Sequence, residues 1–167
     1  IKDILITADG DAETVIINDS TLGLGGKLAA FDYDVIKGFT KDKDAIVSLN
    51  EKQIDSAKRF EYEADAKADA NTIVMPKNQY SVKKILGSKV YDAKGKAVAD
   101  VDTVAFEGDD ADYIVVTFNK VLGVGGDKAA LNIDALTIVQ KDDKYNFTLN
   151  QQQSAQFETA KDAAKTN

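Results

Sequence analysis

Short hydrophobic runs follow one another along this chain, separated by polar stretches that carry glycines or charged clusters. These runs are rich in β-branched and aromatic residues, a composition typical of β-strands. They cover residues 13–17, 28–33, 45–49, 113–118, 128–133 and 145–149. After Asn50 and Asn150 the pattern changes to runs rich in Ala, Lys, Glu and Gln, which predict helices over 51–70 and 151–165 with the two asparagines as N-caps. The chain is therefore predicted to be mainly β, with two helices.

The second half of the chain repeats the first. Residues 21–57 align without a gap on residues 121–157, and residues 12–17 match 111–116 if one residue is inserted before the glycines. The identical positions include both glycine-rich turns, the two asparagines, and Gln53 with Gln153. Self-similarity of this kind indicates two copies of one structural module.

We divide the chain into a first module over 1–70, a linker or covering strand over 71–83, and a second module over 84–167. The second module opens with a predicted hairpin over 86–106, whose turn contains Gly95. The first module has a match only for the second strand of that hairpin, so its opening hairpin is missing and strand edges are left to be covered. Three covers are open: the segment 71–76 (NTIVMP), a strand of another copy, or a preceding segment absent from this sequence.

The second module resembles a PRC-barrel domain, in the segments LGSKVYDAKGKAVADVDTVAF and YIVVTFNKVLGVGGDKAALNIDAL. The resemblance extends over about 84–150 and is partial over 1–50. It implies two small PRC-barrel-like β-barrels in tandem, each followed by a C-terminal helix. Members of this family serve as adaptors in assemblies, and many belong to bacterial secreted or periplasmic proteins.

Composition excludes several classes of function. The chain carries 28 acidic and 21 basic residues, a net charge of −7, which argues against a nucleic-acid partner. It contains no His and no Cys, the commonest general base and two of the commonest metal ligands. No apolar run is long enough to span a membrane. The sequence opens on a strand-like run without an initiator Met, which we interpret as a processed or trimmed chain. The resemblance to secreted and periplasmic PRC-barrel proteins implies a periplasmic or extracellular bacterial location.

The glycine-rich turns are the first candidate site. Their glycines are Gly23, Gly25, Gly26, Gly123, Gly125 and Gly126. A dinucleotide-binding fingerprint requires a further glycine where Leu28 and Lys128 stand, and neither turn has the GK[ST] of a phosphate-binding loop. We interpret both turns as structural, with glycines at positive φ shaping a corner of the barrel.

Two acidic loops are the second candidate site. Their carboxylates are Asp9, Asp11, Glu13, Asp109, Asp110 and Asp112. Carboxylates gathered in a loop can bind Ca²⁺ weakly, although the order of an EF-hand is absent; the alternative is a solvated hairpin turn.

We expect no catalytic residues and no cofactor beyond weakly bound Ca²⁺. The function expected is a non-catalytic structural or adaptor role through protein–protein association, including self-association through a shared β edge. The alternative is a periplasmic protein that binds a cation or small ligand at the acidic loops. An enzyme of unknown type is the third possibility.

Overall fold

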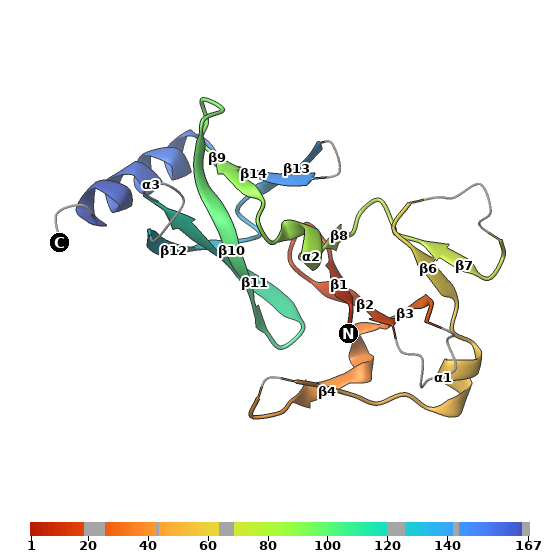
Figure 1. The fold of residues 1–167 in the computed structure, drawn as a ribbon. Coiled ribbons are helices and arrows are strands. Elements are labelled where there is room, and N and C mark those ends of the chain that lie inside the picture. The colour runs from red at the N-terminus through yellow and green to blue at the C-terminus, as the bar shows by residue number, and fades with distance from the viewer. Residues whose placement is uncertain (19–25, 43, 64–68, 120–125, 142–143, 165–167) are drawn as a thin grey trace. The chain divides into compact units, whose positions relative to one another are not determined.

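The computed structural model describes residues 1–18, 26–42, 44–63, 69–119, 126–141 and 144–164. Strands dominate this part of the chain, and the last described element is a helix (Figure 1). Contacts divide the chain into two compact units: unit 1 comprises Ile1–Thr7 and Ala12–Ser81, and unit 2 comprises Ala8–Asp11 and Val82–Asn167. The prediction of a mainly β protein is confirmed.

Unit 1 contains eight described strands and two short helices. They are β1 (Asp3–Ile6), β2 (Ala12–Asn18), β3 (Leu28–Asp32), the 3₁₀ helix η1 (Tyr33–Val35), β4 (Ile36–Phe39), β5 (Ala45–Val47), α1 (Glu51–Asp55), β6 (Arg59–Glu61), β7 (Thr72–Val74) and β8 (Tyr80–Ser81). Six strands form one sheet in the order β7-β6-β3-β2-β1-β8, and β4 pairs with β5 in a separate two-stranded sheet.

Unit 2 contains six described strands and two helices. They are α2 (Val82–Ile85), β9 (Lys89–Tyr91), β10 (Ala97–Glu107), β11 (Asp110–Phe118), β12 (Asp127–Asn132), β13 (Thr137–Lys141), β14 (Lys144–Thr148) and α3 (Gln151–Ala164). The six strands form one sheet in the order β12-β11-β10-β9-β14-β13, with the long β10–β11 hairpin at its centre (Figure 1). The predicted hairpin over 86–106 is confirmed, since β9 pairs antiparallel with β10 and Gly95 has a φ of +78°.

The repeat extends to the pairing register. In unit 1, Val15 of β2 lies opposite Phe31 of β3, and in unit 2 their counterparts Ile114 and Leu131 are paired in the same way. An irregularity in register also recurs at one place, between Leu5 and Ile6 of β1 and between the matching residues of β10. A bulge admits one extra residue into a strand. The extra residue is Glu13 in unit 1 and its counterpart Asp112 in unit 2, so the two copies share this bulge. The one-residue offset between the copies lies instead in the turn that precedes β2 and β11, residues 7–11 against 107–110.

The sheet of unit 1 buries side chains on both faces because successive residues of a strand point to opposite sides. One face carries Val15, Ile17, Ala29, Phe31 and Val35. The other face carries Leu5, Ile16 and Phe60, with Leu28, Ala30, Tyr62, Ile73 and Met75 packed against them. The strand β6 and the residues around β7 thus cover the second face of unit 1.

The corresponding second face of unit 2 is different. Lys128 occupies the place of Leu28, and its ammonium forms an ion pair with Asp102 at 2.6 Å. Tyr113, opposite Asn132 in the sheet, is 45% exposed. This face is therefore adapted to water in unit 2, whereas the equivalent face of unit 1 is a second core.

Both predicted N-caps are present. The Oδ1 atoms of Asn50 and Asn150 accept hydrogen bonds from the backbone amides of Gln53 and Gln153, each at 2.9 Å. The side chains of the two glutamines accept in turn from the backbone amides of the asparagines, at 3.0 and 2.7 Å. These reciprocal bonds form a capping box at the start of each helix.

The first helix is much shorter than predicted. The expected helix over 51–70 ends at Asp55, and β6 begins four residues later; residues 64–68 lie outside the described part. The reason is the alternation of charged and aromatic side chains from Arg59 to Tyr62, a strand pattern that places Phe60 and Tyr62 on the same face. Phe60 is 3% exposed, and its ring meets that of Tyr62 edge-on at 5.0 Å between centroids. The second helix, expected over 151–165, is observed as α3.

The segment 71–83 contains strands that cover sheet edges. Its residues Thr72–Val74 form β7, which pairs in parallel with β6 at the β3 side of the sheet, and its residues Tyr80–Ser81 form β8, which pairs with Leu5 and Ile6 of β1. The segment NTIVMP is therefore a covering strand, but it covers the opposite side of the sheet from β1.

The described strands of each six-stranded sheet form a linear order with two ends, so the prediction of two closed barrels is not confirmed. What is observed is an open sheet in each unit. Within the described ranges, no helix has the length and apolar character needed to cross a membrane.

Candidate functional site

The acidic loops bring two of the six predicted carboxylates together in unit 2. Asp11 and Asp110 are joined by an isolated antiparallel β-bridge, and the amide of Ala111 donates to the carbonyl of Gly10 at 2.9 Å. Desolvation of its carboxyl raises the pKa of Asp110, and a hydrogen bond with Asp11 and the charges of the neighbouring acids raise it further.

The other predicted carboxylates do not complete a cation site. The Glu13 side chain accepts a hydrogen bond from Gln79 Nε2 at 2.5 Å, and both residues belong to unit 1. Asp9, Asp109 and Asp112 are not part of any converging set, since no group of three or more Asp, Glu, His or Cys side chains in the described ranges is placed to hold a metal ion. Binding of Ca²⁺ at these loops stays a prediction.

Only part of each glycine-rich turn is described. Gly26 and Gly126 have φ values of +74° and +117°, which favour glycine. Gly23, Gly25, Gly123 and Gly125 lie outside the described residues.

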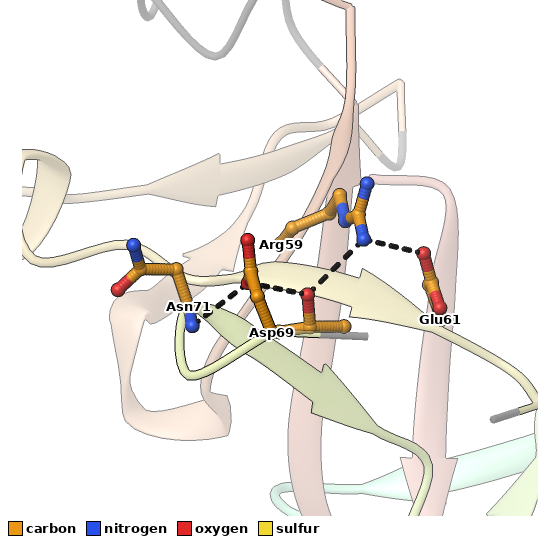
Figure 2. Close-up of polar contacts among 5 residues, drawn as sticks. Arg59, Glu61, Asp69 and Asn71 are labelled. Carbon is orange, nitrogen blue, oxygen red and sulfur yellow. Dashed lines mark hydrogen bonds and ion pairs between the residues drawn. The ribbon is translucent and has the colours of Figure 1, made fainter. Parts of the chain in front are cut away.

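A polar cluster at the start of β6 and β7 was missed by the sequence analysis, which expected helix over 51–70 and a linker or covering strand over 71–83 (Figure 2). Arg59 Nη2 lies 3.0 Å from Glu61 Oε1 and donates to Thr72 Oγ1 at 3.2 Å. Thr72 Oγ1 and the amide of Asn71 donate to Asp69 Oδ1 at 3.0 and 2.9 Å (Figure 2). These two hydrogen bonds, with the charge of Arg59, lower the pKa of Asp69.

This polar cluster has a structural role. The contacts of Asp69 with residues two and three positions ahead form an Asx-type turn, and the Asp-Ala-Asn-Thr sequence is the signal that would have indicated it. Arg59 links that turn to the adjacent strand. The cluster joins β6 to β7 through charged and polar side chains, and it contains no nucleophile–base pair.

A buried carboxylate holds the edge of unit 1 together. Asp3 on β1 is 5% exposed, and its Oδ2 accepts from Tyr62 Oη at 2.8 Å and from Ser81 Oγ at 2.5 Å. Hydrogen bonds compensate a buried carboxylate for its lost hydration. Asp3 therefore ties β1 to β8 and to the residue that follows β6.

A cavity recurs at equivalent positions in the two units. In unit 1 it measures about 250 Å³, and in unit 2 about 310 Å³. Both are lined by equivalent strands, β3 (Ala30–Asp32) in unit 1 and β12 (Ala130–Asn132) in unit 2. Both are also lined by the capped helix of the unit, through Gln53 of α1 or Gln153 of α3. The cavities differ in what else lines them: β6 and β7 contribute Phe60 and Ile73 in unit 1, whereas unit 2 relies on the longer helix α3.

The two-stranded sheet of unit 1 exposes apolar residues. Phe39 at the end of β4 is 55% exposed and Ile46 in the middle of β5 is 49% exposed. In unit 2 the counterpart of β5 is β14, which pairs in parallel with β9, and its Tyr145 and Phe147 are fully buried. In the described part of unit 1 no strand takes the place of β9 beside β5.

No family model and no curated protein matches the sequence.

Proposed function

We propose that this protein is a non-catalytic structural or adaptor protein that associates through the open edge of β5, with a second copy of itself as one partner. Under this proposal both units are PRC-barrel-like, and the protein works in the bacterial periplasm or outside the cell. The observation that carries the proposal is the difference between the two copies of the repeat: β9 joins β14 to its sheet, whereas β5 pairs with β4 alone among the described strands.

The chemistry of the β5 edge supports association. An exposed strand edge presents unpaired amides and carbonyls to a further strand. Phe39 and Ile46 add apolar surface beside this edge, and burying such surface against a partner is favourable. A strand seated parallel to β5 would occupy the place that β9 holds in unit 2 and complete the arrangement seen there.

Light scattering across a dilution series tests this proposal. The unmodified chain is expected to form a dimer or larger assembly that dissociates on dilution, and Ile46→Lys is expected to keep it monomeric, since a charge on an edge strand opposes pairing. Val139→Lys is the matched control, because Val139 is also exposed but lies on β13, in the hairpin whose inner strand is already paired. A chain that is monomeric at every concentration, or that assembles equally well with Ile46→Lys, would refute the proposal.

A further inference from the structure

The cavity of unit 2 lies at an open edge of its sheet. Among the described strands β12 pairs only with β11, so its other edge accepts no strand. The cavity between β12 and α3 has a volume of about 310 Å³ and is lined by uncharged residues, including Ala129, Leu131, Leu149, Phe157 and Ala160. We call this feature the β12 groove.

The repeat shows what fills the same position in unit 1. There the third strand, β3, pairs on this edge with β6, with Ala29 opposite Arg59. Ala29 and Phe31 are 2% and 8% exposed, whereas their counterparts in unit 2, Ala129 and Leu131, remain only half-buried. The described part of unit 2 thus has the acceptor strand without the strand that covers it.

Charges around the β12 groove indicate the chemistry of an occupant. Asp127 begins β12 and Asp134 follows it, and neither forms an ion pair with a described residue. The nearby Lys128 is already neutralised by Asp102 and Lys161 by Glu158. A carboxylate therefore flanks each end of the open edge, and a basic segment would complement both.

We propose that the β12 groove binds an extended, basic segment of a partner protein, which adds a strand to β12 and places one aromatic side chain between β12 and α3. The register of β6 gives the position of that side chain. Arg59 lies opposite Ala29, so the residue at the Arg59 position points to the face that carries Ala129 and Leu131 in unit 2, whereas Phe60 packs on the other face with Leu28 and Ala30. Main-chain hydrogen bonds supply affinity in this mode of recognition, and a pocket for one side chain supplies specificity. This site is distinct from the β5 edge and provides the adaptor with a second kind of contact.

The test uses the full chain and a labelled peptide. The probe has the sequence AKFRTYK, which is residues 57–63 with Arg59→Phe, Phe60→Arg, Glu61→Thr and Glu63→Lys, so that its Phe stands at the position opposite Ala129. Its binding is followed by fluorescence anisotropy. We expect saturable binding that weakens with added salt. The peptide in which Ser replaces this Phe is expected to bind about 30-fold more weakly, the usual consequence of losing a hot-spot side chain.

Two variants of α3 locate the site. Ala160→Arg places a cation on a residue that lines the groove, and it is expected to abolish binding. Ala163→Arg makes the same change on an exposed residue of the same helix that does not line the groove, and it is expected to bind as the unmodified chain does. Arg is a good helix former, so both variants should melt like the unmodified chain.

Three results would overturn this inference. They are a probe that does not bind the unmodified chain, a probe whose binding survives Ala160→Arg, and equal binding of the peptide in which Ser replaces the Phe. If Ala160→Arg instead dissociates an assembly of the chain while the probe fails to bind, the occupant is a second copy and not a basic partner. The β5-edge proposal is tested separately, because Ile46→Lys lies in unit 1 and should leave peptide binding unchanged.

Discussion

Replacing Phe60 with Ala tests whether β6 is part of the core of unit 1. Phe60 is 3% exposed and packs with Leu5 and Ile16 on the second face of the sheet. An aromatic side chain buries at least about 150 Å² of apolar surface, which at about 25 cal/mol per Å² corresponds to about 4 kcal/mol. Core Phe-to-Ala substitutions fall in the same range, about 3–5 kcal/mol. We therefore expect Phe60→Ala to lower the free energy of unfolding of unit 1 by about 3–5 kcal/mol.

Thermal and urea unfolding of the full chain measure this loss. For a domain of this size each kcal/mol shifts the midpoint by roughly 4–8 °C, so the transition of unit 1 should move by more than about 10 °C. Ile1→Ala is the control, since Ile1 is 53% exposed and its loss should change stability by no more than about 0.5 kcal/mol. If Phe60→Ala costs less than about 1 kcal/mol, or no more than Ile1→Ala, Phe60 is not in the core and the reasoning for β6 fails.

Three further predictions concern the backbone and the charge of single residues. Gly10→Ala should destabilise unit 2 more than Gly95→Ala does in calorimetry, because both glycines have positive φ but only at Gly10 would a Cβ meet backbone, at 2.6 Å from the Ala111 oxygen; equal losses would contradict this close packing. Asp69→Asn should lower the melting temperature near pH 7, since the lowered pKa of Asp69 contributes stability above the ordinary carboxyl pKa that is lost as pH falls through the lowered value. Asp110→Asn should do the opposite, raising the melting temperature near pH 7, because a raised pKa costs stability above its own value and that cost disappears as pH falls. Melting curves from pH 7 to pH 2 check both signs, and a gap to the unmodified chain that does not narrow at low pH would contradict them.

The strands and caps of the repeat were predictable because each depends on local sequence. Runs of β-branched and aromatic residues located β2 and β11, and an Asn followed three residues later by Gln marked the start of each helix. These features require only nearest neighbours along the chain. Because the two halves of the sequence align, the strands predicted in one unit could also be predicted at the matching positions of the other.

The elements that were missed depend on contacts distant in sequence. The Ala- and Lys-rich run after Asn50 favours a helix locally, but burying Phe60 against β1 and β2 stabilises a strand instead. The sequence also did not indicate which edge of the sheet NTIVMP covers, because β7 pairs with β6 and only β6 pairs with β3. The pairing of Asp11 with Asp110 also joins residues about a hundred positions apart, and nothing in either loop alone indicates it.

The shared register of the two repeats creates a risk of misfolding that the second face counteracts. In the repeat β2 corresponds to β11 and β3 corresponds to β12, and the two pairs share one register. A folding chain therefore has equivalent hydrogen bonds available if it pairs β2 with β12. Tandem domains of similar sequence are prone to such misassembly. In that mispaired sheet Lys128 would take the place of Leu28 in the cluster that contains Phe60 and Tyr62. It would be separated from Asp102, so its charge would be buried without a partner. A single lysine thus distinguishes the correct partner strand from its near-copy, and a chain carrying Lys128→Leu should refold with a lower yield even though its native state is stable.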